Sequence, residues 1–249
     1  MSEQAVIEFK DVDFAFGESE VLKNVNFSVY RNDFVSVVGP NGGGKTTLLK
    51  LMIGLLKPKS GEIRVFGQVP ELSRRRIGYM PQDTSLDPKF PVSVLDVVLM
   101  GCLGNGMDFG FVGKAKRVAA ERALDEVGLL EMKKRPISAL SGGQRRRLLI
   151  ARSIACDPEI LLLDEPTANL DLLVEREFHQ ILKDLNERLT IVMVSHDLAF
   201  VSKSVERAIC VNRSVAVHRT AEMDGQLFSQ MFGREVKMVV HDRHLRKDE

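Results

Sequence analysis

The 249 residues of this chain are 44% hydrophobic and 28% charged, which is typical of a soluble globular protein with one sizeable core and room for a small additional lobe. The net charge of +1 gives no general attraction to nucleic acid or anionic lipid, and no apolar run approaches the roughly 18 residues of a membrane span. The N-terminal residues lack a signal-peptide pattern and the three cysteines are widely spaced, so we expect a cytosolic protein with free thiols.

The first part of the chain is expected to form strands. Residues 5–16 and 21–30 alternate apolar and polar side chains, which predicts two half-exposed antiparallel strands. Residues 33–39 form a short apolar run with three valines, typical of a buried parallel strand. Residues 61–67 are expected to form an edge strand, and a further strand is expected to end at Pro81.

A glycine-rich segment follows the buried strand and leads into helical spacing over residues 45–56. Gly39, Gly44, Lys45 and Thr46 fit the pattern G-x-x-x-x-G-K-[ST] between a strand and a helix. Glycines let backbone N–H groups turn inward around a phosphate chain, and a helix N-terminus favours an anion. Lys45 can reach the β- and γ-phosphate oxygens, and Thr46 can ligate Mg²⁺. The predicted nucleotide-binding residues of this segment are Gly39, Pro40, Asn41, Gly42, Gly43, Gly44, Lys45, Thr46 and Thr47.

From about Ser93 to Lys134 the pattern becomes helical. Two helices are expected here, joined by a glycine-rich loop over 104–113. We interpret them as a helical subdomain inserted into an α/β core. Ser141 is a suitable N-cap for a further helix that runs to Cys156.

Strands and helices alternate in the rest of the chain, which predicts an α/β fold with a parallel sheet. The expected strands are 159–165 and 190–196, the expected helices are 172–188 and 198–205, and a closing hairpin is expected from 207–212 and 214–219. The residues after this hairpin end in a charged tail that we expect to be mobile.

Two acidic residues, Asp164 and Glu165, follow the buried apolar residues of the first of these strands. Ligands of α/β sheets bind at the carboxyl ends of the strands, so acids at this position can act on a bound phosphate. Asp164 is placed to hold Mg²⁺ through water, and Glu165 is placed to activate an attacking water. The pattern is weak by itself, because many buried strands end in acids for structural reasons.

The pentapeptide LSGGQ at residues 140–144 is the signature of the ATP-binding-cassette (ABC) ATPases, and the sequence resembles this family along almost its whole length. Phe16 matches the aromatic residue that stacks on adenine, and Gln82 matches the glutamine that ends the core sheet and senses the γ-phosphate. Asp171 matches the loop that crosses to a partner subunit, and His196 matches the switch histidine.

The resemblance implies a P-loop NTPase core with a mainly parallel sheet, an N-terminal antiparallel β subdomain and an inserted helical signature subdomain. It implies one ABC ATPase domain over residues 4–240. Within it, the core and antiparallel β subdomain are expected over 1–90 and 157–220, and the helical subdomain over 91–156. Residues 241–249 remain as a charged tail.

The resemblance also implies an ATP-dependent homodimer that closes on two ATP molecules with Mg²⁺ and opens after hydrolysis. Two chains packed head to tail place the signature of one against the γ-phosphate held by the other. The residues expected to contact nucleotide in this way are Ser141, Gly142, Gly143, Gln144 and Asp171. The catalytic residues implied are Lys45, Gln82, Glu165 and His196, and the implied Mg²⁺ ligands are Thr46, Gln82 and Asp164.

Two details depart from the commonest family pattern. Gly43 stands where serine, alanine or cysteine is usual, which we expect to add flexibility without removing a phosphate contact. Arg145, Arg146 and Arg147 follow the signature, where a glutamine often occupies the middle position. We interpret these arginines as a solvated face rather than as a nucleic-acid patch.

Residues 79–104, together with 209–223 and 231–233, resemble the ATPase subunits of bacterial zinc and manganese importers. This resemblance implies a separate integral membrane permease, indirect dependence on a substrate-binding protein, a location on the cytoplasmic face of the membrane, and no nucleic-acid partner. Import of iron, haem or cobalamin remains an alternative, as does a soluble ABC-type ATPase in iron–sulfur assembly or on DNA or ribosomes. His241 and His244 are interpreted as solvated tail residues rather than a metal sensor.

Overall fold

The alternating N-terminal residues form a three-stranded antiparallel sheet in the computed structural model, which describes residues 5–82, 90–102, 113–167, 171–195 and 205–220. Strands β1 (Ala5–Phe16), β2 (Ser19–Tyr30) and β4 (Ser60–Val65) pair in the order β2-β1-β4. Phe9 and Phe27 stack across the β1–β2 pair with ring centroids 4.5 Å apart. The predicted antiparallel pair and the edge strand are confirmed.

A six-stranded sheet forms the centre of the molecule in the order β5-β6-β7-β3-β8-β9. The strands are β3 (Phe34–Val38), β5 (Ile77–Met80), β6 (Ile160–Asp164), β7 (Thr190–Val194), β8 (Arg207–Asn212) and β9 (Ser214–Arg219). Neighbouring strands are parallel from β5 to β8, and only β9 is antiparallel to its neighbour. The predicted parallel sheet and closing hairpin are confirmed, and every residue of β3, β6 and β7 is buried.

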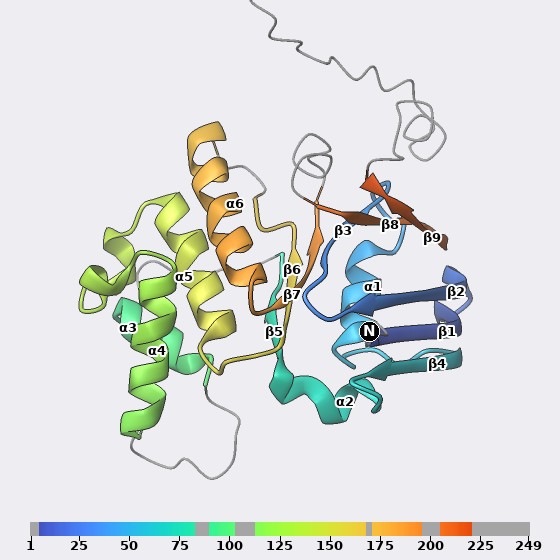
Figure 1. Ribbon diagram of the computed structural model, residues 1–249, viewed down its shortest axis with the longest axis horizontal. Helices are drawn as coiled ribbons and strands as arrows, with labels where there is room; N and C mark the ends of the chain where they lie inside the picture. The colour runs from blue at the N-terminus through green and yellow to red at the C-terminus, as the bar shows by residue number, and fades with distance from the viewer. Residues whose placement is uncertain (1–4, 83–89, 103–112, 168–170, 196–204, 221–249) are drawn as a thin grey trace, which may run out of the picture.

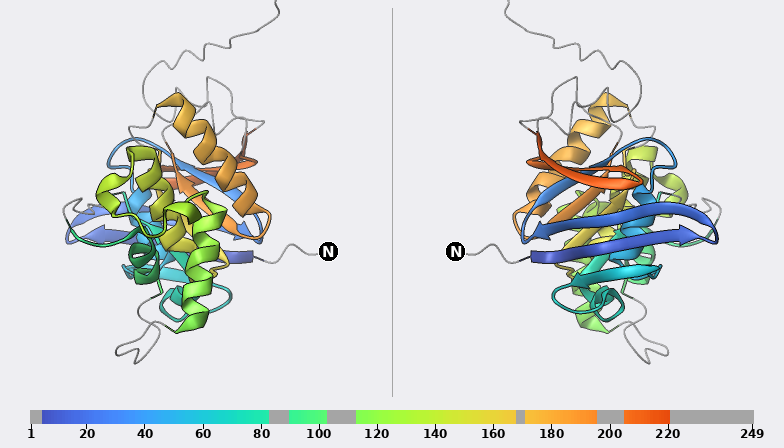
Figure 2. Two further views of the ribbon diagram at one scale, coloured as in Figure 1. Left: turned by 90° about the vertical axis from the view of Figure 1, so that its left-hand side faces the viewer. Right: turned by 90° about the vertical axis from the view of Figure 1, so that its right-hand side faces the viewer.

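Helices cover both faces of this sheet (Figure 1). They are α1 (Lys45–Met52), α2 (Pro70–Ser73), α3 (Val94–Met100), α4 (Lys114–Glu126), α5 (Gly142–Ile154) and α6 (Leu172–Asn186). One core joins α1, the antiparallel sheet and one face of the central sheet. The other core joins α3 to α6 and the opposite face. Figure 2 shows α3, α4 and α5 on one side of the molecule and β1, β2 and β4 on the other.

Several predicted boundaries were wrong for local reasons. Helix α1 ends at Met52 rather than near residue 56, because Gly54 adopts a φ of 71° that terminates the helix. Helix α5 ends at Ile154, two residues before the predicted end. The short helix α2 was not predicted. The helix expected over 198–205 and the loop expected over 104–113 fall almost entirely outside the described residues, as does the C-terminal tail.

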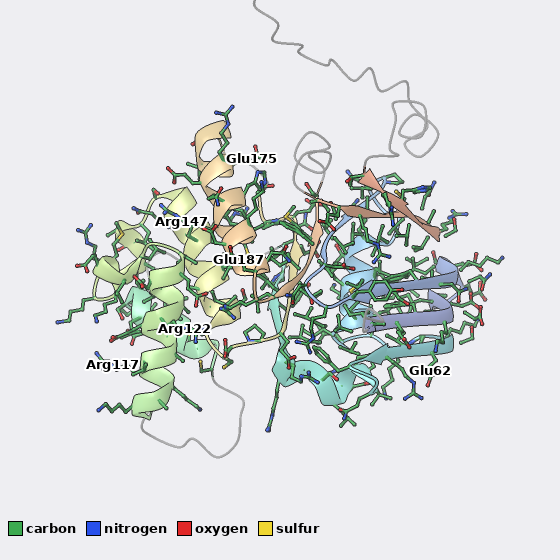
Figure 3. The ribbon with its side chains drawn as sticks, viewed as in Figure 1. Glu62, Arg117, Arg122, Arg147, Glu175 and Glu187 are labelled. Atoms are coloured by element: carbon green, nitrogen blue, oxygen red, sulfur yellow. The ribbon has the colours of Figure 1, made fainter. Side chains whose placement is uncertain are left out.

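The interpretation of Arg145, Arg146 and Arg147 as a solvated face was wrong, because all three are half-buried. Helix α6 packs beside the first turn of α5, and Arg147 Nη2 lies 4.0 Å from Glu177 Oε2 of α6 (Arg147 is labelled in Figure 3). Partly exposed ion pairs of this length contribute little stability, so the contact between Arg147 and Glu177 adds little to the fold. Within the described part of the chain, no helix is long and apolar enough to cross a membrane.

Candidate functional site

The glycine-rich segment forms the connection between β3 and α1, as predicted. Gly44 is the N-cap of α1 and has a φ of 105°, a conformation that glycine adopts far more readily than other residues. At Gly39 a side chain would be blocked, since a Cβ there would lie 2.0 Å from the carbonyl oxygen of Val211 in β8. The loop is therefore folded tightly between the end of β3, the start of α1 and strand β8.

Gly43 has a packing role that differs from the expected gain in flexibility. A Cβ at this position would lie 2.9 Å from the carbonyl oxygen of Val211 and 3.0 Å from that of Pro40. The Gly43 carbonyl also accepts a hydrogen bond of 3.3 Å from the backbone N–H of Arg213. The glycine thus allows the loop to lie against β8 and the turn that follows it.

Lys45 points its ammonium group back over the loop. Its Nζ donates hydrogen bonds of 3.0 Å to the carbonyl oxygens of Gly39 and Pro40. The residue is 6% exposed, and this burial lowers the pKa of the ammonium group, against the opposing effect of the Glu165 and Asp164 carboxylates. The protein therefore holds a buried cation at the start of a helix, where phosphate oxygens can replace the loop carbonyls as partners.

Asp164 lies at the end of β6 and is 1% exposed. Its Oδ1 accepts a hydrogen bond of 3.2 Å from the Thr46 hydroxyl, whereas its Oδ2 is buried without a hydrogen-bond partner among the described residues. Burial raises the pKa of Asp164, although the Thr46 hydrogen bond works in the other direction. A buried carboxylate oxygen without a partner is costly, so this atom is a candidate ligand position for a cation.

Glu165 follows Asp164 in a left-handed backbone conformation, with a φ of 49°. Few residues other than glycine adopt this conformation, which is enriched at functional sites. The conformation turns the Glu165 side chain toward the end of β5, where its Oε2 accepts a hydrogen bond of 2.9 Å from Gln82 Nε2. Two residues that are 83 positions apart in the sequence therefore face each other across one site.

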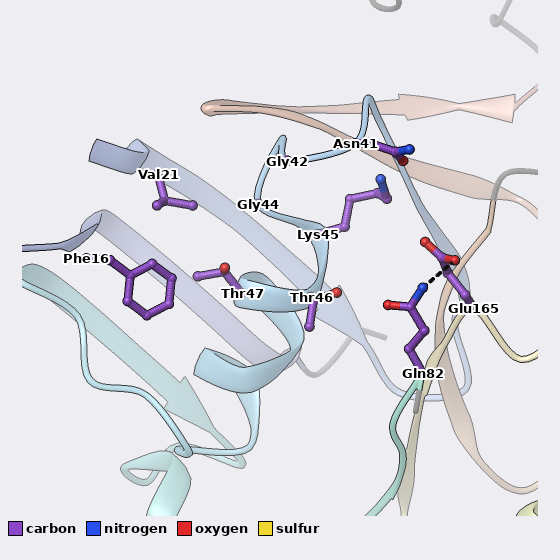
Figure 4. A pocket seen from close by; sticks show the side chains of 10 residues that line it. All are labelled: Phe16, Val21, Asn41, Gly42, Gly44, Lys45, Thr46, Thr47, Gln82 and Glu165. Carbon is purple, nitrogen blue, oxygen red and sulfur yellow. Dashed lines mark hydrogen bonds between the residues drawn. The ribbon is translucent and has the colours of Figure 1, made fainter. Parts of the chain in front are cut away.

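These residues line a cavity of about 690 Å³ (Figure 4). Its lining residues are Phe16, Val21, Asn41, Gly42, Gly44, Lys45, Thr46, Thr47, Gln82 and Glu165. The volume lies within the roughly 300–1,000 Å³ range of small-molecule sites. Phe16 stands at one end, 56% exposed and in edge contact with Phe14, so its ring is free to stack on a planar group. Glu165 and Gln82 stand at the other end (Figure 4).

The sequence prediction covers the cavity except for Val21, which follows the turn between β1 and β2. The alternation of β2 is the only sequence signal for this residue. Gly39, Pro40 and Gly43 do not line the cavity, because they form the side of the loop that faces β8 and Lys45. Lys45 and Glu165, separated by 120 positions, both face the cavity.

The signature residues lie elsewhere in the chain, and none of them lines this cavity. Ser141 is the N-cap of α5, and its hydroxyl accepts a hydrogen bond of 3.2 Å from the backbone N–H of Gln144. The Gln144 side chain accepts one of 3.0 Å from the backbone N–H of Ser141, which completes a capping box. Ser141 and Gly142 are exposed, so this helix N-terminus is open to a partner.

The two signature glycines differ in their surroundings, which allows structural and functional roles to be separated. A Cβ at Gly143 would lie 2.6 Å from Val174 Cγ1 in α6, whereas no atom of the described residues lies within 4 Å of a Cβ at Gly142. We expect Gly143→Ala to destabilise the fold by about 1–3 kcal/mol through overpacking, and Gly142→Ala to leave stability unchanged within about 0.5 kcal/mol. Urea unfolding of both variants checks this. Equal stability of the two variants would contradict the packing role of Gly143.

The remaining predicted residues are only partly described. Asp171 is the N-cap of α6, where its Oδ1 accepts a hydrogen bond of 3.0 Å from the backbone N–H of Val174. This capping role was not predicted, and the partner-subunit role stays a prediction. His196 lies outside the described residues, directly after the buried Ser195 that follows β7.

The chain is similar to known proteins over most of its length. The family model described as ABC transporter matches residues 22–168. A Chlamydia trachomatis protein named "Probable metal transport system ATP-binding protein" is 39% identical over 94% of this chain and 99% of its own length. The Treponema pallidum "Zinc transport system ATP-binding protein TroB" is 35% identical, covering 95% of this chain and 93% of that protein.

Solved structures agree in fold. A chain of an ABC transporter described as of metal-chelate type, in an inward-facing conformation, is 31% identical with a TM-score of 0.82 and covers 92% of this chain and 89% of its own. CbiO1 of Clostridium perfringens, part of the ABC transporter complex cbiONQ, is 27% identical with a TM-score of 0.78 and covers 88% of this chain and 90% of its own.

Proposed function

This chain belongs to the ABC transporter family and is an ATPase, and from that premise we propose that it is the ATP-hydrolysing subunit that powers a divalent-metal importer. The observation that carries the ATPase chemistry is the juxtaposition of Lys45, Thr46 and Glu165 around one cavity. Phosphate oxygens of ATP replace the loop carbonyls as partners of Lys45, and the adenine stacks on the exposed ring of Phe16.

The residues at the end of β6 fit a magnesium ion. Mg²⁺ takes oxygen ligands, and Asp164 Oδ2 is a buried carboxylate oxygen that has no hydrogen-bond partner in the described part of the chain, while Oδ1 of the same carboxylate accepts from the Thr46 hydroxyl. We propose that Thr46, Asp164 and Gln82 hold the ion, with Asp164 acting through water. When bound, Mg²⁺ would neutralise negative charge on the phosphates of ATP.

Replacement of Asp164 tests its proposed role in holding Mg²⁺, and the measured quantity is the Tm of the protein. Because burial raises the pKa of Asp164, the folded protein binds this proton more tightly than the unfolded chain, and ionisation at neutral pH opposes folding. We therefore expect Asp164→Asn to raise the Tm of the nucleotide-free protein in EDTA by a few degrees, since about 1 kcal/mol shifts the Tm of a chain this size by about 2–4 °C. The difference should shrink as the pH falls through the raised pKa.

The same variant is expected to lose most of the additional stabilisation that Mg²⁺ and ATP together give the wild type, because stabilisation by a ligand follows its affinity. Thermal melts with EDTA, with ATP alone and with Mg²⁺-ATP check both expectations. Asp125→Asn, a change of the same charge at an exposed position on α4, is the control and should behave as wild type. A lower Tm of Asp164→Asn in EDTA would contradict the account of the buried charge.

The hydrolytic step needs a positioned water and stabilisation of the transferred phosphoryl group. We propose that Glu165 polarises the water, since its carboxylate faces the cavity and is oriented by the Gln82 amide. Lys45 neutralises charge on the γ-phosphoryl, and His196 holds and orients the γ-phosphate. The left-handed backbone of Glu165 supports this role, because it is the feature that aims the carboxylate at the site.

A second chain completes this site in our proposal. Ser141 and Gly142 are exposed at the N-terminus of α5, away from the cavity of their own chain. Backbone N–H groups at a helix N-terminus bind anions, so this end suits the γ-phosphate held by a partner copy. ATP then joins two chains head to tail, and Asp171 lies at the crossing between them.

The transported substrate is proposed from the relatives. Those named above carry metal or zinc transport in their names. A third, the "Zinc import ATP-binding protein ZnuC" of Pseudomonas entomophila, is 35% identical over 96% of this chain and 89% of its own length. We propose import of zinc or manganese through a separate membrane permease, with a substrate-binding protein acting on that permease. The chain then works at the cytoplasmic face of the membrane.

Purification of a tagged chain from detergent-solubilised native membranes tests the transport role. We expect a polytopic membrane protein to copurify in near-equal amount. Uptake of radioactive zinc or manganese into cells should require this chain and fail in its Glu165→Gln variant. Loss of iron, haem or cobalamin uptake instead would overturn the metal assignment. Copurification with soluble scaffold proteins or nucleic acid alone would overturn the transport role and leave the ATPase chemistry intact.

A further inference from the structure

Two cysteines that are far apart in the sequence meet where α3 and α5 end. Gly101, the residue after α3, lies against the last turn of α5, and a Cβ at Gly101 would be 2.1 Å from the carbonyl oxygen of Arg152. Cys102 follows Gly101, and Cys156 lies in the turn that follows α5, two residues after Ile154. The glycine therefore allows a close backbone approach that brings the two cysteines together.

The Cys102 and Cys156 thiols interact with each other and with the backbone beside them. Cys156 Sγ donates a hydrogen bond of 3.4 Å to the carbonyl oxygen of Gly101, next to Cys102. Burial raises the pKa of the Cys102 thiol to about 12, and a side-chain hydrogen bond with Cys156 adds to this effect. Cys102 is 2% exposed and Cys156 is half-buried, and both are free thiols in this structure.

A cavity opens on the Cys156 side of the pair. A cavity of about 430 Å³ between β5 and the ends of α3 and α5 is lined by Gly101, Arg152 and Cys156, among others, but not by Cys102. Gly78 of β5 contributes to the same close packing, because a Cβ there would lie 2.3 Å from the carbonyl oxygen of Ser153. A small oxidant in this cavity therefore meets Cys156, and the buried Cys102 thiol interacts with Cys156 outside the cavity lining.

We propose that Cys102 and Cys156 are a redox-reactive pair that a hydroperoxide oxidises to a disulfide in the folded protein. Cys156 Sγ attacks hydrogen peroxide, the O–O bond breaks, and a sulfenic acid and one water form. Cys102 Sγ then attacks that sulfur, its proton leaves with the displaced hydroxide as a second water, and an S–S bond forms. Two thiols are oxidised by two electrons, and the peroxide is reduced to two waters.

The disulfide ties the end of α3 to the end of α5. It closes a long loop of the chain, and cross-links of long loops give the largest stabilisation in the chain-entropy model. Free thiols in a reducing compartment suit this chemistry, since disulfides formed there are usually transient and redox-sensing. The proposal rests on the geometry of the two helix ends and does not require the transport role.

Treatment of the purified full-length chain with hydrogen peroxide tests the proposal. We expect an intact-mass loss of about 2 Da, a Cys102–Cys156 disulfide in the non-reducing peptide map, and a Tm increase of at least about 5 °C that dithiothreitol reverses. The third cysteine is an internal control. Cys210 is buried in β8 and does not line the cavity beside Cys156, so it should stay reduced.

Cysteine-to-serine variants distinguish the thiol that attacks the peroxide from the thiol that then forms the disulfide. Cys156→Ser should abolish both oxidation steps, whereas Cys102→Ser should stop at a sulfenic acid on Cys156 that dimedone labels. Cys210→Ser should form the disulfide as the wild type does. Its Tm before oxidation should equal that of the wild type, which excludes misfolding of this control variant. The proposal is overturned if the wild type and Cys210→Ser show no Cys102–Cys156 disulfide, or if the disulfide appears only above the Tm.

Discussion

Replacing Glu165 by glutamine is expected to leave ATP binding intact and to reduce hydrolysis by about 10²–10⁴-fold, the contribution of a positioned general base. Glutamine keeps the size of the side chain, and its amide oxygen can still accept the hydrogen bond that Gln82 Nε2 donates at 2.9 Å. What is lost is the negative charge that polarises water at the cavity end opposite Phe16 (Figure 4). Phosphate release and fluorescent-nucleotide binding measure the two quantities separately.

A second readout follows from the proposed head-to-tail pairing. If hydrolysis reopens the paired chains, the Glu165→Gln variant should accumulate with Mg²⁺-ATP at twice the monomer mass in size-exclusion light scattering, while the wild type does not. Glu187→Gln, at the exposed C-cap of α6, makes the same change of charge away from the site and should behave as wild type. A Glu165→Gln variant that hydrolyses ATP at close to the wild-type rate would refute the assignment of Glu165.

The elements and the nucleotide loop could be predicted because their signals are local. Alternation in the first thirty residues identifies strands by its period, and the continuous apolar runs at β3, β6 and β7 indicate buried strands by their short length. The spacing of glycines before Lys45 predicts a phosphate-binding loop, because the backbone must turn tightly between a strand and a helix and glycine allows the conformations that this turn needs. These signals do not depend on distant residues, and the structure confirms the elements that they predict.

Other features depend on neighbours that no local pattern contains. The position of β3 between β7 and β8 sets the loop against Val211, and this neighbour gives Gly43 its packing role. Gly143 is needed beside Val174 of α6, although the family resemblance suggests only a phosphate contact. The left-handed backbone of Glu165 and its hydrogen bond with Gln82 likewise appear only once β5 and β6 are adjacent.

The largest loss of nucleotide affinity is expected from Lys45→Met. Methionine keeps an unbranched stem of similar length in the buried position but cannot donate a hydrogen bond or carry charge. Hydrogen bonds to charged groups contribute about 1.5–3 kcal/mol each, so loss of two such bonds to phosphate weakens ATP binding by about 10²–10⁴-fold. Hydrolysis at saturating ATP should fall as well, because the same charge stabilises the transferred phosphoryl group. Equilibrium binding of a fluorescent ATP analogue measures the affinity.

The surroundings of the Lys45 ammonium group in this structure support this expected loss of affinity. Its Nζ is held by the carbonyl oxygens of Gly39 and Pro40, at 3.0 Å each, and burial already lowers the pKa of the ammonium group. The protein thus keeps a partly desolvated cation in a folded loop before ATP arrives, which reduces the reorganisation that binding requires. Lys50→Met, one turn further along the same helix, removes an equal charge and should keep the wild-type affinity. Equal losses in the two variants would show that the overall positive charge of α1, rather than the Lys45 ammonium in its loop, binds the phosphates.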